Sequence, residues 1–229
     1  GSSNAEVREF VAKALIEKAR EVAQVGRTDE AIAAYDEVAE RFKHSYDLRE
    51  YVASALLNKG LRLAESRRFD EAVAAYDDLF ARFKKDIEPS LREVVGNLPP
   101  ASEPLLRGIV ANALFHRAQA LAELGRNEQA LAACDDIITR FRLAAEPASR
   151  QVLARTLVRK CGLIDQNEHA ADVVEVCDLY LSLFADAKDA EIRALVPRVL
   201  FNRAAALGRS QRPEEALGDY DALVSSLHD

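Results

Sequence analysis

The sequence predicts an all-α protein made of a repeated pair of helices, and three observations support this fold class. Alanine, the residue that favours helices most, is frequent, whereas the chain of 229 residues has only 9 glycines and 7 prolines. A pair of similar segments recurs five times. The apolar residues of both segments follow the spacing of one helix face. We therefore expect five stacked helix-turn-helix repeats.

The second helix of each repeat is the easier one to recognise. Its first copy reads DEAIAAYDEVAERF, and the five copies occupy residues 29–42, 70–83, 128–141, 172–184 and 214–227. Before each copy lies a first helix with its own apolar stripe, such as ALLNKGLRLA at 55–64. Because one helix pair cannot bury its apolar face alone, neighbouring repeats must pack together.

The spacing of the copies identifies an insertion. Tyr35, Tyr76, Cys134, Cys177 and Tyr220 occupy the same place in the five second helices, and they are 41, 58, 43 and 43 residues apart. The long second step coincides with a duplication, since EPSLREVV at 88–95 returns as EPLLRGIV at 103–110. Helix-breaking residues separate the two copies in GNLPP at 96–100. We expect a short extra helix near 89–95 and then an exposed loop.

These patterns give the domain organisation. We expect an expression remnant at 1–3 and a single domain over 4–229. Its repeats occupy about 4–44, 45–83, 103–145, 146–188 and 189–229, with the insertion at 84–102. Gly26 is placed to end a first helix, and Pro213 to begin a second one. Pro197 predicts a kink or a late start of the first helix of repeat five. The chain has no methionine, so we expect it to derive from a longer protein.

Composition narrows the function classes. The net charge of −7 disfavours nucleic-acid binding, and no apolar run is long enough to span a bilayer. With no signal-peptide pattern, we expect a cytoplasmic protein that contacts neither nucleic acid nor membrane. Cys134, Cys161 and Cys177 form no CxxC pair and fall at core positions, where we interpret them as small apolar residues. No catalytic or metal motif is present, and we expect no enzyme activity, cofactor or metal.

The recurring residues resemble the tetratricopeptide repeat (TPR) family. In that pattern a large apolar residue precedes a small one, a turn glycine, an alanine and an aromatic residue. Repeat one supplies Leu15, Ala19, Gly26, Ala31 and Tyr35. Repeats two and three supply Leu56, Gly60, Ala72 and Tyr76, and then Leu114, Ala118, Gly125, Ala130 and Cys134. The period of about 43 residues exceeds the family's usual period of roughly 34, which indicates a long-period variant.

The resemblance implies an α-α superhelix, or solenoid, whose first helices line a concave face. Members of the family bind peptides or segments of other proteins and are rarely enzymes. We therefore interpret the chain as a non-catalytic protein-protein interaction scaffold with its partner in the concave groove.

A charge pattern accompanies the repeats. A basic residue recurs in the first helices, at Lys18, Lys59, Arg117, Lys160 and Arg203. An aspartate recurs in the second helices, at Asp36, Asp77, Asp135, Asp178 and Asp221. These residues either hold an acidic partner or form a ladder of ion pairs within or between repeats. We favour the ladder because both series recur five times, and we choose Lys59 with Asp77 as the pair to test.

The residues expected on the concave face differ between repeats. The candidates for peptide binding are Asn58, Asn112, His116, Arg155, Arg159, Arg198 and Asn202. The last four form two pairs with a spacing of four residues, which places each pair on one helix face. Asparagine and arginine there are similar to the family's carboxylate clamp, because a guanidinium group holds a carboxylate with two hydrogen bonds. The partner is then acidic or carboxylate-ended; the alternative is an ordinary solvated polar face.

Two other functions stay open. Repeat five lacks a capping helix, so that end or the insertion would support homo-oligomerisation. The chain is otherwise a sensory or regulatory region of a larger multidomain protein. One apolar position of the first helices, at Ile16, Leu57, Phe115, Val158 and Phe201, either lines a hydrophobic groove or belongs to the core, which we favour.

Overall fold

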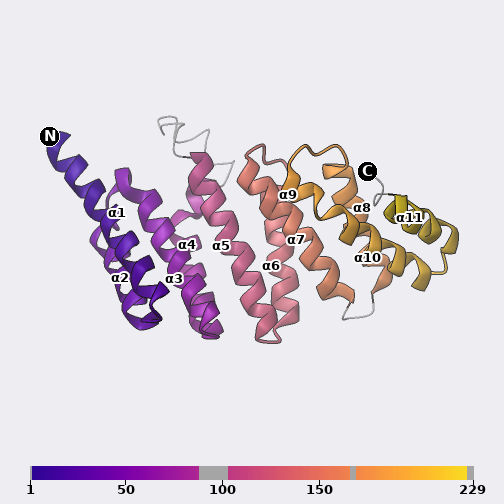
Figure 1. Cartoon of the computed structure of the whole chain (residues 1–229), viewed down its shortest axis with the longest axis horizontal. Coiled ribbons are helices and arrows are strands. Elements are labelled where there is room, and N and C mark those ends of the chain that lie inside the picture. The colour runs from indigo at the N-terminus through magenta and orange to yellow at the C-terminus, as the bar shows by residue number, and fades with distance from the viewer. Residues whose placement is uncertain (1, 88–102, 166–168, 226–229) are drawn as a thin grey trace. The chain divides into compact units, whose positions relative to one another are not determined.

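The computed structural model describes residues 2–87, 103–165 and 169–225 (Figure 1). These residues form α-helices joined by short turns, and no strand occurs among them. The predicted all-α fold is therefore confirmed. The extra helix expected near 89–95 and the loop after it lie outside the described residues, as does most of the proposed insertion at 84–102.

The chain divides into two compact units, Gly1–Ala130 (unit 1) and Leu131–Asp229 (unit 2). Unit 1 holds helices α1 (Ser2–Gln24), α2 (Thr28–Arg41), α3 (Arg49–Glu65), α4 (Phe69–Ile87) and α5 (Glu103–Glu123), with a single 3-10 turn, Tyr46–Leu48, before α3. Each helix packs on the next one, and the first helices α1, α3 and α5 also contact one another. They form one layer, and α2 and α4 pack beside it (Figure 1).

Helix α6 (Asn127–Phe141) begins in unit 1 and continues into unit 2. Unit 2 then holds α7 (Pro147–Asp165), α8 (Ala170–Phe184), α9 (Ala190–Arg193), α10 (Val196–Arg209) and α11 (Pro213–Ser225). Helix α8 packs against α7 and α10, and α10 packs against α11. The repeated helix pairs of the predicted fold are therefore present.

Proline sets the start of several helices in unit 2. Helix α10 begins at Val196 with Pro197 in its first turn, and the short helix α9 precedes it. The late start predicted from Pro197 is thus confirmed, because proline has no N–H to donate and is tolerated only in the first turn. Pro213 likewise opens α11, as predicted.

The turns between paired helices share one geometry. Gly26 and Gly125 have φ of 79° and 71°, in the left-handed region that favours glycine. Arg67 and Gln211 occupy the same place in repeats two and five, with φ of 60° and 57°. In all four turns the next residue donates its N–H to a carbonyl five residues back, as Arg27 does to Val22 at 3.1 Å. This Schellman-type bond fixes the turn even where the sequence lacks glycine.

Aromatic residues anchor both cores. Tyr35 and Tyr76 are buried in unit 1, and Tyr76 lies against Gly60 of its own repeat. In unit 2 the buried Tyr180 donates its hydroxyl to the Ile192 carbonyl at 2.6 Å and packs on Phe184, with ring centroids 5.1 Å apart. The hydroxyl is thus satisfied inside the core, as most buried polar groups are.

The cysteines behave as the apolar residues that the sequence predicts. Cys134, Cys161 and Cys177 are all buried and unbridged. Burial raises the pKa of the Cys134 thiol to about 12. A thiol contact with Cys161 at 3.4 Å, together with burial, raises the pKa of Cys177. Since only the thiolate is a good nucleophile, we interpret Cys134 and Cys177 as packing residues.

Candidate protein-binding surface

Ion pairs link successive repeats in a fixed register. In each case the basic residue of a first helix binds the aspartate of the preceding second helix. The four pairs are Lys59–Asp36 at 2.6 Å, Arg117–Asp77 at 2.5 Å, Lys160–Asp135 at 2.5 Å and Arg203–Asp178 at 2.6 Å. Two of these pairs lie in unit 1 and two in unit 2. The predicted ladder is confirmed, and its register is between repeats.

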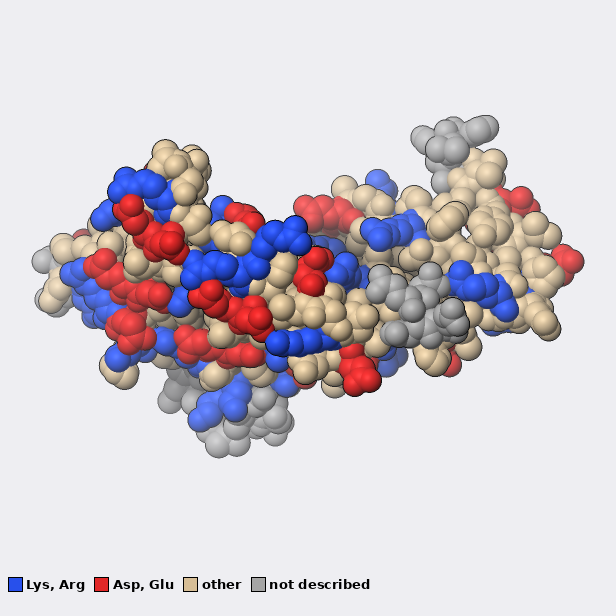
Figure 2. All heavy atoms as spheres, turned by 90° about the horizontal axis from the view of Figure 1, so that it is seen from below, with Lys and Arg blue, Asp and Glu red and all other residues tan. Residues whose placement is uncertain are grey.

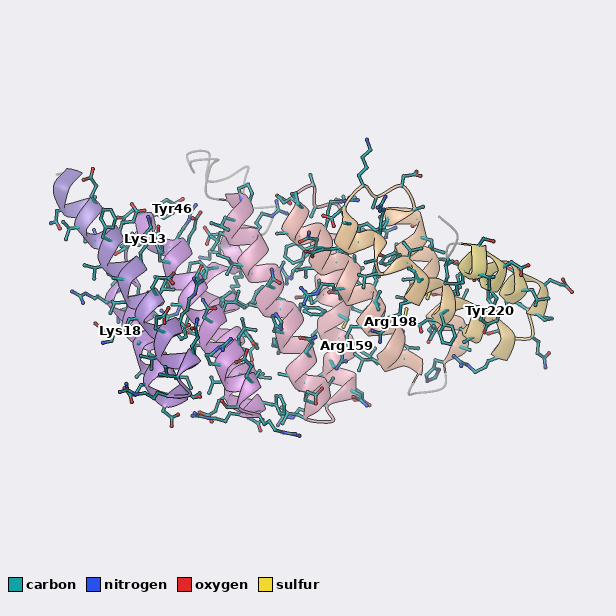
Figure 3. All side chains as sticks on the ribbon, viewed as in Figure 1. Lys13, Lys18, Tyr46, Arg159, Arg198 and Tyr220 are labelled. Carbon is teal, nitrogen blue, oxygen red and sulfur yellow. The ribbon has the colours of Figure 1, made fainter. Side chains whose placement is uncertain are left out.

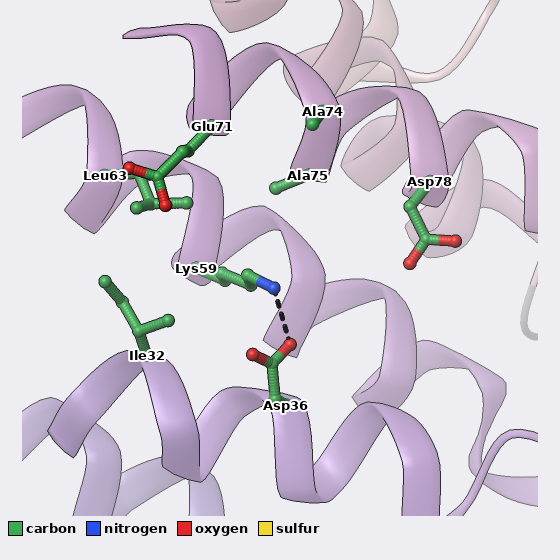
Figure 4. Close-up of a pocket in the computed structure, with 8 residues that line it drawn as sticks. All are labelled: Ile32, Asp36, Lys59, Leu63, Glu71, Ala74, Ala75 and Asp78. Atoms are coloured by element: carbon green, nitrogen blue, oxygen red, sulfur yellow. Dashed lines mark hydrogen bonds and ion pairs between the residues drawn. The ribbon is translucent and has the colours of Figure 1, made fainter. Parts of the chain in front are cut away.

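The pair chosen for testing from the sequence was wrong. Lys59 binds Asp36 of repeat one, whereas Asp77 of its own repeat binds Arg117. The sequence cannot distinguish these partners, because both aspartates recur at the same position in every repeat. Packing decides the partner, since α3 lies beside α2 with Lys59 directed towards Asp36 (Figure 4).

A double-mutant cycle tests this register. We expect a coupling free energy of about 0.3–1 kcal/mol between Lys59 and Asp36, since the carboxylate is half-exposed and screened by water. The matched cycle on Lys59 and Asp77 should give a coupling within about 0.3 kcal/mol of zero. Urea unfolding of the alanine variants, followed by circular dichroism, supplies both values. Equal coupling in the two cycles would contradict the observed register.

A second set of ion pairs was missed by the sequence analysis. Arg68 donates to Asp29 of repeat one at 2.6 Å and also to Glu71 at 2.7 Å. Arg126 in turn binds Asp70 of repeat two at 2.8 Å. The available signal was the motif RxxE, which recurs before the second helices at 27–30, 68–71 and 212–215. Each arginine of this motif binds the glutamate three residues later, and Arg68 and Arg126 also join neighbouring repeats.

A shallow pocket of about 330 Å³ lies between α2 and α4, over Lys59 (Figure 4). Its walls combine apolar residues such as Ile32 and Leu63 with the carboxylates of Asp36, Glu71 and Asp78. No cluster of three or more potential metal ligands occurs among the described residues. The pocket exposes the Lys59–Asp36 pair to solvent, which explains why we expect only modest coupling.

Charges of both signs are mixed over unit 1. Figure 2 shows acidic and basic side chains in interleaved rows over the left part of the view, which belongs to this unit. Many of them form ion pairs, including Arg82 with both Asp78 and Glu40. A charged side chain that already forms an ion pair has fewer donors or acceptors left to bind a ligand. An acidic partner is therefore expected to bind cations that have no carboxylate beside them.

The candidate site residues of unit 1 use part of their hydrogen-bonding capacity locally. Asn58 donates to the Ser54 carbonyl at 2.8 Å, and Asn112 donates to the Gly108 carbonyl at 2.9 Å. His116 contacts Gln119 through Nδ1 at 2.8 Å, and its ring packs near those of Tyr76 and Phe115. Each amide keeps its carbonyl oxygen and one N–H for another partner.

The candidate residues of unit 2 lie on two helices that contact each other, α7 and α10. Arg155 and Arg159 are half-buried and one turn apart on α7, whereas Arg198 and Asn202 are one turn apart on α10. Figure 3 shows Arg159 and Arg198 close to each other in this view. Neither arginine forms an ion pair within the described residues.

Two arginines of this surface, Arg155 and Arg159, are partly buried, which affects how they would bind a ligand. The Nε of Arg159 is buried and has no hydrogen-bond partner in the described part of the chain. Burial also lowers the pKa of the Arg155 guanidinium, although the Glu191 carboxylate opposes the shift. Removing a cation from water makes its charged form more costly, and an incoming carboxylate would offset that cost.

Comparison with known proteins supports the predicted class. The tetratricopeptide repeat family model matches residues 112–143, which span parts of α5 and α6. No curated protein sequence matches the chain. Two crystal structures of a predicted kinesin light chain from Podosopora anserina, with nearly identical TPR-like repeats, have the same fold. They are 12% and 13% identical, each with a TM-score of 0.59.

The likeness extends along almost the whole of both chains. The alignments cover 93% and 94% of this chain, and 92% and 95% of the two solved structures. The chain therefore has the fold of TPR-like helical repeat proteins. The predicted resemblance is confirmed in sequence for one repeat and in fold along the chain. None of the described helices has both the length and the hydropathy to cross a membrane.

Proposed function

We propose that this chain is a non-catalytic scaffold that binds an acidic or carboxylate-ended segment of another protein. The observation that carries the proposal is the pair of arginines, Arg159 and Arg198, on neighbouring first helices of unit 2. Neither forms an ion pair within the described residues, although most first-helix cations at the ladder position do. Tetratricopeptide repeat proteins commonly bind proteins or peptides, which supports this class of partner.

The chemistry of arginine fits such a partner. A guanidinium group presents a planar fork of donors, which binds both oxygens of a carboxylate. Arg155 and Asn202 lie one turn from the two central arginines and would add donors on either side. The acidic or terminal carboxylate would therefore lie across α7 and α10 of unit 2.

The three candidate residues of unit 1 have a lesser role in this proposal. Asn58 and Asn112 are held by bonds to their own helices, which fixes their orientation at little further entropic cost. His116 is held by Gln119 and by aromatic neighbours. They present ordered polar groups on unit 1, whereas the charge that selects the partner lies with the arginines of unit 2.

Binding of peptides with and without a terminal charge tests the proposal. An array of acidic peptides is prepared in two forms, with a free carboxylate and with a carboxamide end. Hits are measured by calorimetry against wild type and the double variant Arg159→Glu/Arg198→Glu. We expect the variant to bind at least about tenfold more weakly, with a weaker salt dependence.

A matched variant controls for net charge. Arg142→Glu/Lys188→Glu introduces the same charge change at two exposed residues in the turns of unit 2. It should bind the peptides much as wild type does. An equal loss of affinity in both double variants would show that only net charge matters, through long-range electrostatics. Unchanged affinity in the Arg159→Glu/Arg198→Glu variant would show that this surface is not the binding site.

A further inference from the structure

The last repeat exposes a face that the earlier repeats bury. Tyr220 is 37% exposed, whereas Tyr35 and Tyr76 at the equivalent position are 1% and 0% exposed. Phe201 is 58% exposed, whereas its counterpart Phe115 is 4% exposed. The two exposed rings lie together, with centroids 6.4 Å apart (Tyr220 is labelled in Figure 3). No described residue covers this side of α10 and α11, which we name the tail face.

The tail face is apolar and has a carboxylate beside it. Leu217 and Val224 on α11 are 54% and 63% exposed, and they lie three residues before and four residues after Tyr220. Residues with this spacing share one side of a helix. Asp221 follows Tyr220 at the ladder position, and it forms no ion pair within the described residues. In the earlier repeats this aspartate binds the first helix of the next repeat.

The first repeat exposes the complementary side, which we name the head face. Ala14 on α1 is exposed, whereas its counterparts Ala55 and Ala113 are fully buried. Ala34 on α2 is partly exposed, whereas its counterpart Ala75 is buried. Lys18 lies one turn after Ala14 at the basic ladder position (Figure 3).

Lys18 is the counterpart of the ladder bases that bind a preceding aspartate. It is exposed, and no carboxylate of the described chain pairs with it. The same interface therefore occurs repeatedly inside the chain, while its two halves stand exposed at opposite end repeats. The head face carries the cation Lys18, and the tail face carries the carboxylate Asp221.

We propose that the tail face of one copy binds the head face of a second copy of this chain. Asp221 then accepts from Lys18 of the second copy, as Asp36 accepts from Lys59 within the chain. Tyr220 and Phe201 pack against the small residues Ala14 and Ala34. Such a contact joins two different surfaces, so each copy keeps one face for a further copy and more than two copies can join. The inference is independent of the proposed peptide binding.

The interfaces between repeats inside the chain indicate how the tail face and the head face would pack together. Tyr76 stacks on His116 of the next repeat, with ring centroids 6.2 Å apart, and becomes fully buried there. Tyr220 would reach the equivalent position of a second copy, which is Glu17. Because burial of an aromatic side chain provides most of the binding free energy, Tyr220 is expected to dominate and the ion pair to set the register.

Sedimentation velocity over a range of protein concentrations tests this proposal. We expect the wild-type chain to grow from its monomer mass of 25.3 kDa to species larger than a dimer. Tyr220→Ser should remove association, whereas Leu143→Ser, at a 93% exposed leucine outside both faces, should leave it unchanged. Circular dichroism confirms that each variant keeps its helices.

A charge swap isolates the ladder contact. Lys18→Glu and Asp221→Lys should each weaken association about tenfold, because like charges then meet. Mixing the two single variants restores an opposite-charge pair at every contact, and so does combining both changes in one chain. We expect association to return in both cases. A wild-type chain that stays monomeric overturns the proposal, and so does association that the Tyr220 and charge variants leave intact.

Discussion

Replacing Gly60 by alanine is expected to destabilise unit 1 by about 2 kcal/mol. Glycine in the middle of a helix normally costs about 0.5–1 kcal/mol relative to alanine, so propensity alone predicts the opposite sign. Here the steric effect is larger. A Cβ at position 60 would lie 2.3 Å from Cε1 and 2.7 Å from Cζ of Tyr76. The ring is fully buried, so a shift of the ring would disturb the packed core around it.

The control is Gly162→Ala in α7, where the added Cβ meets no atom within 4 Å apart from the nearby backbone of its own helix and its chain neighbours. That substitution should stabilise unit 2 by about 0.5–1 kcal/mol through helix propensity alone. Urea unfolding of both variants, followed by circular dichroism, gives the two signs. If Gly60→Ala also stabilised the protein, the close approach of Tyr76 to α3 would be incorrect.

The repeat architecture was predictable because it is written as a period in the sequence. Each second helix carries the same apolar stripe, so five copies reinforce one another where a single helix would be ambiguous. The turns were only partly predictable. Gly26 and Gly125 signal the left-handed residue, but Arg67 and Gln211 adopt it without glycine. There the packing of both helices imposes a conformation that the local sequence disfavours.

Partners were harder to predict than elements. The sequence shows that Lys59 needs an aspartate, but two aspartates with the same repeat position compete for it. Only the packing of α3 against α2 selects Asp36. The same reason explains the candidate site. The spacing of Asn58 marks a polar helix face, but its bond to the Ser54 carbonyl depends on the side-chain conformation.

Comparison of equivalent positions also identifies residues of the first and last repeats whose exposure is unusual. A residue such as Tyr220 is unremarkable as a single exposed tyrosine, since exposed apolar side chains are common. It becomes informative because the same position is buried in the other repeats. The other repeats thus show how exposed a residue at this position normally is, and a protein without repeats offers no such comparison.

Arg203→Ala is expected to destabilise unit 2 by about 2–3 kcal/mol, the largest effect among the ladder residues. Arg203 donates from Nε to Asp178 at 2.6 Å and from Nη1 to both oxygens of Asp219 at 2.9 Å. The Asp219 side chain is only 11% exposed. Truncation would leave this carboxylate buried without its cation, and such a group costs more than a lost surface ion pair.

Arg212→Ala is the matched control, because Arg212 belongs to the same repeat and binds Glu215 at 2.6 Å. Both members of this ion pair are about half-exposed, so we expect a much smaller loss of stability than for Arg203→Ala. Urea unfolding of the two variants at neutral pH measures the difference. The double variant Arg203→Ala/Asp219→Asn should recover part of the loss, since the amide needs no counter-charge. Equal destabilisation by both arginine variants, or no recovery in the double variant, would contradict a buried carboxylate that depends on Arg203.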